Sequence, residues 1–191
     1  MSVELVYETH ATTLDNEAAI ATGWLPGELS PSGREQARAL GARRRDDGIE
    51  VVYASDLARA AETARIAFDG VQVDIPLDIH TDVRLRECDY GDLNGSPTAS
   101  LHPRARYVQT PFPGGQSYAD VILQTLGFLA DVRRKHQGRR VLVIAHAANR
   151  WALQHLATGV PLAAIVDAPF AWQPGWEYVV TEDGVVASPT R

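Results

Sequence analysis

The sequence predicts an α/β protein: a three-layer α/β/α sandwich with a mostly parallel β-sheet between the helices. Short apolar runs that favour strands alternate along the chain with segments whose apolar residues recur at helical spacing. One of these runs, residues 141–145, is apolar at every position, which is typical of a parallel strand covered on both faces. We see no internal repeat and no low-complexity tract that would interrupt this alternation.

The N-terminal part is expected to hold a strand, a long loop and a helix. Residues 3–8 form the strand and residues 9–29, which are polar and contain glycine and proline, form the loop. Ser30 is suited to cap a helix, with Pro31 at its first position. That helix is expected to run to about residue 45, before an Asp-Asp-Gly sequence.

A second strand and helix are expected next. Residues 49–54 are rich in β-branched side chains and predict a strand. Ser55 can cap the following helix, whose alanines and Phe68 recur at helical spacing. Residues 77–80 predict a further short strand.

An irregular segment follows at about residues 88–115, rich in glycine, proline and polar residues. It is too long for a plain connection, so we expect a small cap inserted into one domain that spans residues 1–191. An amphipathic helix is predicted at 118–135 and another helix at about 149–157. Residues 164–187 predict strands joined by a turn at Gln173-Pro174-Gly175.

Composition excludes several classes of protein. The net charge of −6 argues against a nucleic-acid-binding protein, which normally presents a basic face. No apolar run approaches the roughly 18 residues that a membrane span requires, and the N-terminus lacks a signal-peptide pattern. Cys88 is the single cysteine, so neither an internal disulfide nor a cysteine-based zinc site is available. We therefore expect a cytoplasmic protein that binds neither nucleic acid nor membrane.

Three polar residues follow predicted strand ends: His10, Ser55 and His146. Ligands of open α/β sheets bind beyond the carboxyl ends of the strands, so these residues could meet at one edge. A neutral imidazole can attack phosphorus and form a covalent intermediate, if donors hold the oxygens and an acid protonates the leaving group. His10 is the candidate nucleophile and Glu87 the candidate acid. Candidate groups that hold the phosphate oxygens are His146, Arg59 and Asn16.

Several fragments, in order and at sensible spacing, resemble the histidine phosphatase superfamily, with its phosphoglycerate mutase-like fold. His10, Thr13 and Asn16 match the opening motif of that family. Matching fragments also occur at Leu29–Ala37, Ser55–Ala64, Leu85–Asp92, Pro113–Ser117 and Val143–His146. The resemblance covers nearly the whole chain. It implies a phosphohistidine at His10, a phosphate pocket with Arg59 and His146, and Glu87 as acid and then base, without metal or cofactor.

The chain departs from the family motif at three positions. Thr9 stands where the family has arginine, Ala11 where it has glycine, and Gln116 where it often has glutamate. Loss of one transition-state donor costs about 100- to 1000-fold in rate in comparable sites. Arg86, next to Glu87, could swing inward to compensate. Strand alternation could turn the charge of Glu8 away from the direction of Thr9. The predicted substrate-binding set is Arg59, Asn16, Thr9, Thr13, Arg86 and Ala147.

The predicted function is hydrolysis of a small phosphomonoester, so the expected partner is a small phosphorylated metabolite; a homodimer is compatible with the sequence. Two alternatives stay open. A phosphate-binding or regulatory protein of the same fold would explain Thr9, and a phosphoglycerate mutase-type phosphotransferase is the other. Tyr90, Trp172 and Trp176 are expected to pack rather than stack on substrate. If any of them reaches the pocket, it would favour a ring-bearing substrate.

Overall fold

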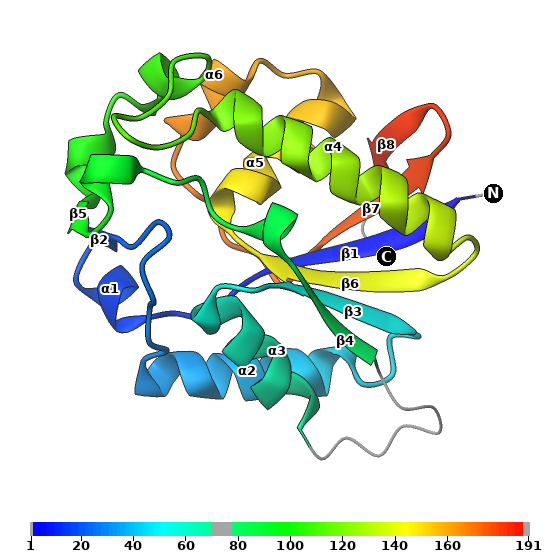
Figure 1. Cartoon of the computed structure of the whole chain (residues 1–191). Helices are drawn as coiled ribbons and strands as arrows, with labels where there is room; N and C mark the ends of the chain where they lie inside the picture. Colours follow the sequence, from blue (N-terminus) through cyan, green and yellow to red (C-terminus); the bar gives the residue numbers. More distant parts are fainter. Residues whose placement is uncertain (1, 70–77, 189–191) are drawn as a thin grey trace.

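A six-stranded sheet with strand order β4-β3-β6-β1-β7-β8 runs through the centre of the computed structural model (Figure 1), which describes residues 2–69 and 78–188. The strands are β1 (Val3–Thr9), β3 (Val51–Ser55), β4 (Asp78–Asp82), β6 (Arg140–Ala145), β7 (Trp176–Thr181) and β8 (Gly184–Ala187). The first four are parallel, whereas β7 and β8 pair antiparallel at one edge. The predicted α/β class with a mostly parallel sheet is confirmed.

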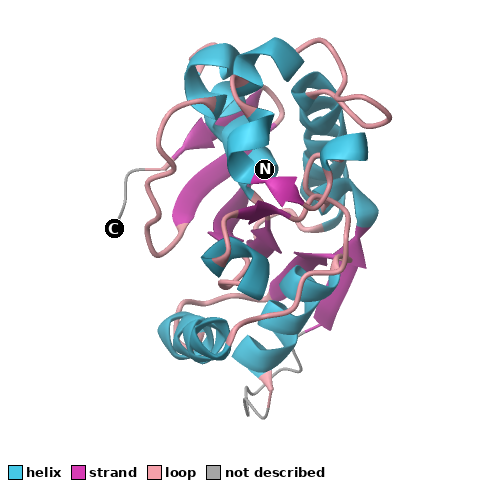
Figure 2. Cartoon of the chain, turned by 90° about the vertical axis from the view of Figure 1, so that its left-hand side faces the viewer, coloured by secondary structure: helices cyan, strands magenta, loops and turns pink. Residues whose placement is uncertain are grey.

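Helices cover both faces of this sheet. The lower layer in Figure 1 holds α2 (Pro31–Arg44) and α3 (Ala58–Phe68), and the upper layer holds α4 (Tyr118–Lys135) and α5 (Ala147–Thr158). Figure 2 shows the same layers after a quarter turn. Because strand side chains alternate between the two faces, Val6 joins the buried cluster with Leu40 of α2, while Tyr7 joins the cluster with Phe128 of α4. The core is therefore divided in two by the sheet.

The start of α2 positions the loop that follows β1. Ser30 caps the helix as expected, and its side chain accepts a hydrogen bond from the Gly33 amide at 3.1 Å. The Ser30 amide in turn donates to the Thr12 carbonyl at 3.0 Å. A Cβ at Gly33 would lie 1.9 Å from that carbonyl oxygen, so this close approach requires glycine. Residues 10–12 are thereby held on the end of α2.

Two details of the first half differ from the prediction. The loop at 9–29 contains α1 (Leu14–Glu17) and β2 (Ile20–Ala21), and β2 pairs with β5 (Ser96–Pro97) of the predicted cap. Ser55 does not cap α3: it ends β3, and its Oγ accepts from the Leu57 amide at 3.2 Å, which forms a turn before the helix begins. Residue 77, where a strand was expected to begin, lies outside the described residues.

The C-terminal prediction is wrong in two places. Residues 162–166 form a helix, α6 (Leu162–Val166), rather than the start of a strand. Pro161 precedes it, and Leu162, Ile165 and Val166 recur at helical spacing, so one face is buried against the core. The turn at 173–175 leads into β7 and does not join two strands.

The predicted cap consists of β5 and three short 3-10 helices, at Gly91–Leu93, Thr98–Leu101 and Arg104–Tyr107. Its buried residues Leu101 and Phe112 belong to one apolar cluster with Trp151 of α5 and Val166 of α6. The segment is thus packed on the upper helices. Over the part of the chain that the structure describes, none of the helices combines the length and apolar character needed to cross a bilayer.

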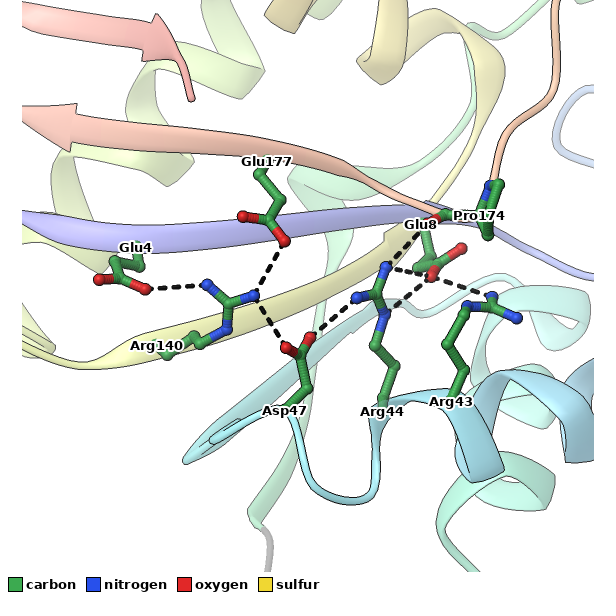
Figure 3. Close-up of polar contacts among 8 residues, drawn as sticks. All are labelled: Glu4, Glu8, Arg43, Arg44, Asp47, Arg140, Pro174 and Glu177. Atoms are coloured by element: carbon green, nitrogen blue, oxygen red, sulfur yellow. Dashed lines mark hydrogen bonds and ion pairs between the residues drawn. The ribbon is translucent and has the colours of Figure 1, made fainter. Parts of the chain in front are cut away.

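An ion-pair network, drawn in Figure 3, fixes the end of β1 to α2. Glu8 is only 1% exposed and accepts from Arg44 at 2.8 Å and from Arg43 at 3.1 Å. Arg44 also donates to Asp47 at 2.8 Å and to the Pro174 carbonyl at 3.1 Å. The remaining members are Arg140, Glu4 and Glu177. The charge of Glu8 therefore faces α2, on the opposite side of β1 from Thr9.

Candidate active site

A cavity of about 410 Å³ lies beyond the carboxyl ends of the parallel strands. His10 follows β1, Arg59 lies in the first turn of the helix after β3, and Ala147 begins the helix after β6; all three line the cavity. Glu87, from the segment after β4, lines it as well. Residues far apart in the sequence therefore converge at the edge where α/β sheets bind ligands.

The ring of His10 is held in one orientation by the backbone. Its Nδ1 lies 2.8 Å from the Ala11 carbonyl oxygen. A carbonyl can only accept, so this contact assigns the proton to Nδ1 and leaves the lone pair on Nε2. Burial, together with the nearby charge of Arg59, lowers the pKa of His10 to about 3. The imidazole is therefore neutral at physiological pH, as a nucleophile requires.

Arg59 is buried beside this lone pair. Its Nε donates to His10 Nε2 at 3.3 Å, while Nη1 and Nη2 donate to the carbonyls of Leu25 (3.2 Å) and Gly23 (2.8 Å). The two carbonyls hold the guanidinium plane in place. A phosphate at His10 would find a fixed, permanently charged donor.

His146 faces His10 at the end of β6. The centroids of the two rings lie 5.0 Å apart, and His146 is 0% exposed. Neither ring nitrogen of His146 has a hydrogen-bond partner among the described residues. Burial, followed by the charge of Arg59 and the proximity of the His10 ring, lowers the pKa of His146 well below its ordinary value. Buried polar atoms without partners are costly, so the two nitrogens leave hydrogen-bonding capacity beside His10. His146 itself is not among the residues that line the cavity.

Glu87 places a carboxyl group at the same cavity. The side chain is buried, and one carboxyl oxygen accepts from the Cys88 amide at 2.8 Å. Burial raises the pKa of Glu87, although the Cys88 amide, Arg59, the Ala148 amide and Arg104 act in the opposite direction. A carboxyl group with a raised pKa retains its proton closer to neutral pH, which suits a general acid.

The other predicted residues divide into two groups. Thr9, Asn16 and Ala147 line the cavity. Thr13 does not line it; its buried hydroxyl caps α1 and accepts from the Asn16 amide at 3.0 Å. The side-chain oxygen of Asn16 in turn accepts a hydrogen bond from the Thr13 amide at 3.0 Å.

Arg86 is not brought to the cavity. Its Nε and Nη2 donate to the two carboxyl oxygens of Asp56 at 2.8 and 2.6 Å, and its guanidinium lies 4.7 Å from the centre of the Trp24 ring. The charge of the Arg86 guanidinium is balanced by Asp56 and stacked on Trp24, so the side chain points away from the carboxyl group of Glu87. Arg86, which was expected to swing inward, is therefore not placed to bind a phosphate in the cavity.

Arg104 lines the cavity and was missed by the sequence analysis. Its backbone amide donates to Asp167 at 2.7 Å, while the side-chain Nε is buried and has no partner among the described residues. The guanidinium lies 5.8 Å from the centre of the Trp151 ring. The only signal in the sequence was an arginine inside the irregular segment that had been expected to be functional.

Among the predicted aromatic residues, Trp176 packs in the core as expected. Tyr90 packs in the apolar cluster of the insertion and also lines the cavity, whereas the exposed Trp172 lines the cavity. Over the described residues, no group of three or more His, Cys, Asp or Glu side chains is placed to hold a metal ion. The arrangement offers a neutral imidazole, a buried cation and a carboxyl group around one cavity, with the fully buried second imidazole of His146 against His10. These are the groups that phosphoryl transfer through a covalent intermediate needs.

Comparison with known proteins agrees with this geometry. The family model of the histidine phosphatase superfamily (branch 1) matches residues 9–176. A 2,3-bisphosphoglycerate-dependent phosphoglycerate mutase of Methylobacterium sp. (strain 4-46) is 31% identical over 84% of this chain and 83% of its own length. Phosphoserine phosphatase 1 of Hydrogenobacter thermophilus is 28% identical over 84% and 79%.

Solved structures show the same fold. Bacillus stearothermophilus YhfR has a TM-score of 0.83 at 24% identity, with 97% of this chain and 95% of that chain covered. A mycobacterial glucosyl-3-phosphoglycerate phosphatase in complex with VO3 has a TM-score of 0.80 at 25% identity, with 97% and 96% covered. Because the family match spans most of the chain, the chain belongs to the histidine phosphatase superfamily, branch 1.

Proposed function

We propose that the protein hydrolyses phosphomonoesters through a phosphohistidine at His10. The observation that carries the proposal is the orientation of the His10 ring, whose Nε2 lone pair faces Arg59 while Nδ1 is bound to a backbone carbonyl. In this proposal the substrate phosphate lies in the cavity at His10 Nε2, where its oxygens accept from Arg59 Nε and from the imidazole of the neighbouring His146.

In the first step, His10 Nε2 attacks phosphorus and a nitrogen–phosphorus bond forms. The bond between phosphorus and the ester oxygen breaks, and the protonated Glu87 gives its proton to the leaving alkoxide. The alcohol departs and the Glu87 carboxylate remains. The raised pKa of Glu87 supports this role, because the acid form must be present when the substrate binds.

In the second step, water takes the place of the alcohol. The Glu87 carboxylate accepts a proton from the water as its oxygen attacks phosphorus, and the nitrogen–phosphorus bond breaks. Phosphate leaves, and neutral His10 and protonated Glu87 are restored. We take water rather than a second alcohol as the acceptor because the insertion between β4 and α4 is small.

A phosphatase assay across substrate classes tests the proposal. Purified protein is incubated with sugar phosphates, nucleotides and phosphoglycerates, and free phosphate and isomerised substrate are both measured. Release of phosphate by the native protein and its loss in His10→Ala support hydrolysis. Isomerised substrate without free phosphate supports the mutase alternative, and binding without either product supports the regulatory alternative suggested by Thr9.

A matched control uses a histidine outside the cavity. His155 lies on α5 and its ring bonds to the Val160 carbonyl. We expect His155→Ala to retain the activity that His10→Ala loses. An acid-labile phosphoryl label that is present in the native protein and absent from His10→Ala identifies the intermediate. Equal labelling of both variants would exclude His10 as the nucleophile.

A further inference from the structure

The mouth of the cavity carries large aromatic side chains that face water. Trp172 is 62% exposed and Phe170 is 41% exposed, and both line the cavity that contains His10. Tyr90 and Trp151 line it as well. Exposed apolar surface that gathers at a concave site marks a place where a ligand covers it.

The segment that bears Phe170 and Trp172 is fixed at both ends. We call residues 167–175 the aromatic loop. At its start, the two carboxyl oxygens of Asp167 accept from the amides of Arg104 and Ala105 at 2.7 and 2.9 Å. Near its end, the Pro174 carbonyl accepts from Arg44 at 3.1 Å, as Figure 3 shows. The loop is therefore held against both the insertion and α2.

The dimensions of the cavity indicate where the parts of a substrate would lie. Its volume of about 410 Å³ is in the range of sites that enclose a whole small molecule. The phosphate is bound at His10 and Arg59 in the proposed function, so the alcohol portion contacts the rest of the lining. That lining offers broad aromatic side chains and one further guanidinium, Arg104, whose Nη1 lies 2.5 Å from His102 Nε2.

These observations favour a particular class of alcohol. Indole and phenyl faces bind flat rings by stacking and edge contacts, which a saturated or flexible chain cannot match. The guanidinium of Arg104, which also lines the cavity, would suit an acceptor atom on or beside such a ring. We infer that the substrate's alcohol portion carries a flat ring that packs against Trp172 and Phe170 while its phosphate lies at His10. This inference rests on the phosphatase function proposed above.

Matched substrates test the inference. Adenosine 5′-monophosphate and ribose 5-phosphate share the same ester and differ in the flat base; benzyl phosphate and cyclohexylmethyl phosphate differ in whether the ring is flat. We expect kcat/KM to be about 10-fold higher for the flat-ring member of each pair. In Trp172→Ala this ratio should fall close to 1, because the stacking face is removed.

The control variant removes an exposed apolar side chain elsewhere. Leu123 of α4 is 68% exposed and does not line the cavity. We expect Leu123→Ala to keep both the activity and the flat-ring ratio. A ratio near 1 in the native protein, or a ratio that Trp172→Ala leaves unchanged, overturns the inference. The inference is also overturned if a phosphoseryl peptide is hydrolysed faster than either flat-ring ester, at a rate that Trp172→Ala does not change.

A binding measurement separates this inference from the proposed function. Benzylphosphonate and cyclohexylmethylphosphonate have no ester bond to break, so calorimetry reports the ring site without turnover. Tighter binding of benzylphosphonate, lost in Trp172→Ala, supports the ring site even if no ester is hydrolysed, and in that case only the proposed hydrolysis fails. Hydrolysis that depends on His10 with equal affinity for the two phosphonates overturns the ring site alone.

Discussion

Arg59 Nε donates to Nε2 of His10 at 3.3 Å, so the guanidinium occupies the lone pair that would attack phosphorus. A phosphate oxygen is a stronger acceptor for a charged donor than a neutral imidazole is. Arrival of the phosphate therefore redirects the Arg59 donor to the ligand and frees the nitrogen. The other two donors of Arg59 stay on the Leu25 and Gly23 carbonyls, so the guanidinium needs no reorganisation.

This arrangement predicts that charge alone cannot replace Arg59. In Arg59→Lys the ammonium cannot bind both carbonyls and also present a fixed donor to the phosphate. We expect kcat/KM for phosphate release to fall about 100- to 1000-fold. The exposed Arg65 of the same helix provides the control, since Arg65→Lys should retain full activity. Native activity in Arg59→Lys would contradict the role of the fixed guanidinium.

The raised pKa of Glu87 predicts the alkaline side of the pH profile. Protonated Glu87 is needed for the first step, so kcat/KM should decrease as pH rises through the raised pKa. In Glu87→Gln we expect a rate about 100-fold or more lower for benzyl phosphate, without that decrease. The loss should be much smaller for 4-nitrophenyl phosphate, whose leaving group needs no proton. Glu35→Gln, on the exposed face of α2, should leave both profiles unchanged, and an equal loss for both esters in Glu87→Gln would argue against the acid role.

The position of Thr9 in the cavity predicts that its substitution by arginine increases the activity. Thr9 lines the cavity, and the cavity contains only Arg59 and Arg104 as guanidinium groups within the described residues. We expect Thr9→Arg to increase kcat/KM for a generic phosphoester about 10-fold, because it adds a donor beside His10. Thr12→Arg adds the same charge at another cavity threonine and should not reproduce the gain. A lower rate in Thr9→Arg would mean that the cavity is built around threonine.

The buried ion pair predicts an effect on stability rather than on chemistry. Arg44→Met leaves the carboxylate of Glu8 buried with only Arg43 beside it and frees the Pro174 carbonyl. We expect the free energy of unfolding, measured with urea, to fall by about 3–5 kcal/mol. Arg38→Met removes an exposed ion pair with Glu35 and should cost less than about 1 kcal/mol. Equal losses would show that burial of the Glu8 pair is unimportant.

Local chemistry predicted much of the fold. The start of α2 at Ser30 and Pro31 depends on capping and on a fixed proline φ, and both act within a few residues. The run of apolar residues in β6 identified a central strand, because a strand covered on both faces is apolar at every position. The helix at Leu162–Val166 was missed because so short a helix is stabilised by its buried face, which depends on distant partners.

The candidate site was also predictable only where local sequence or strand order determines a residue's position. His10 and His146 could be expected to meet, because both follow parallel strands and the sheet fixes where such strands end. Arg86 lies beside Glu87 in the sequence, yet Asp56, 30 residues away, decides where its side chain points. Arg104 reaches the cavity through a bond to Asp167, 63 residues away, which no local pattern indicates. The assigned catalytic roles remain predictions until the variants are measured.

The two anchors of the aromatic loop make substrate preference transferable. Asp167 and Pro174 are held by partners outside the loop, so residues 168–173 can change in length and identity while both attachments stay in place. A graft of the corresponding stretch from a relative would then carry over its choice of alcohol without disturbing the two imidazoles. If the ring site lies on this loop, exchange of one short segment would change the choice of alcohol in this chain and leave His10, Arg59 and Glu87 in place.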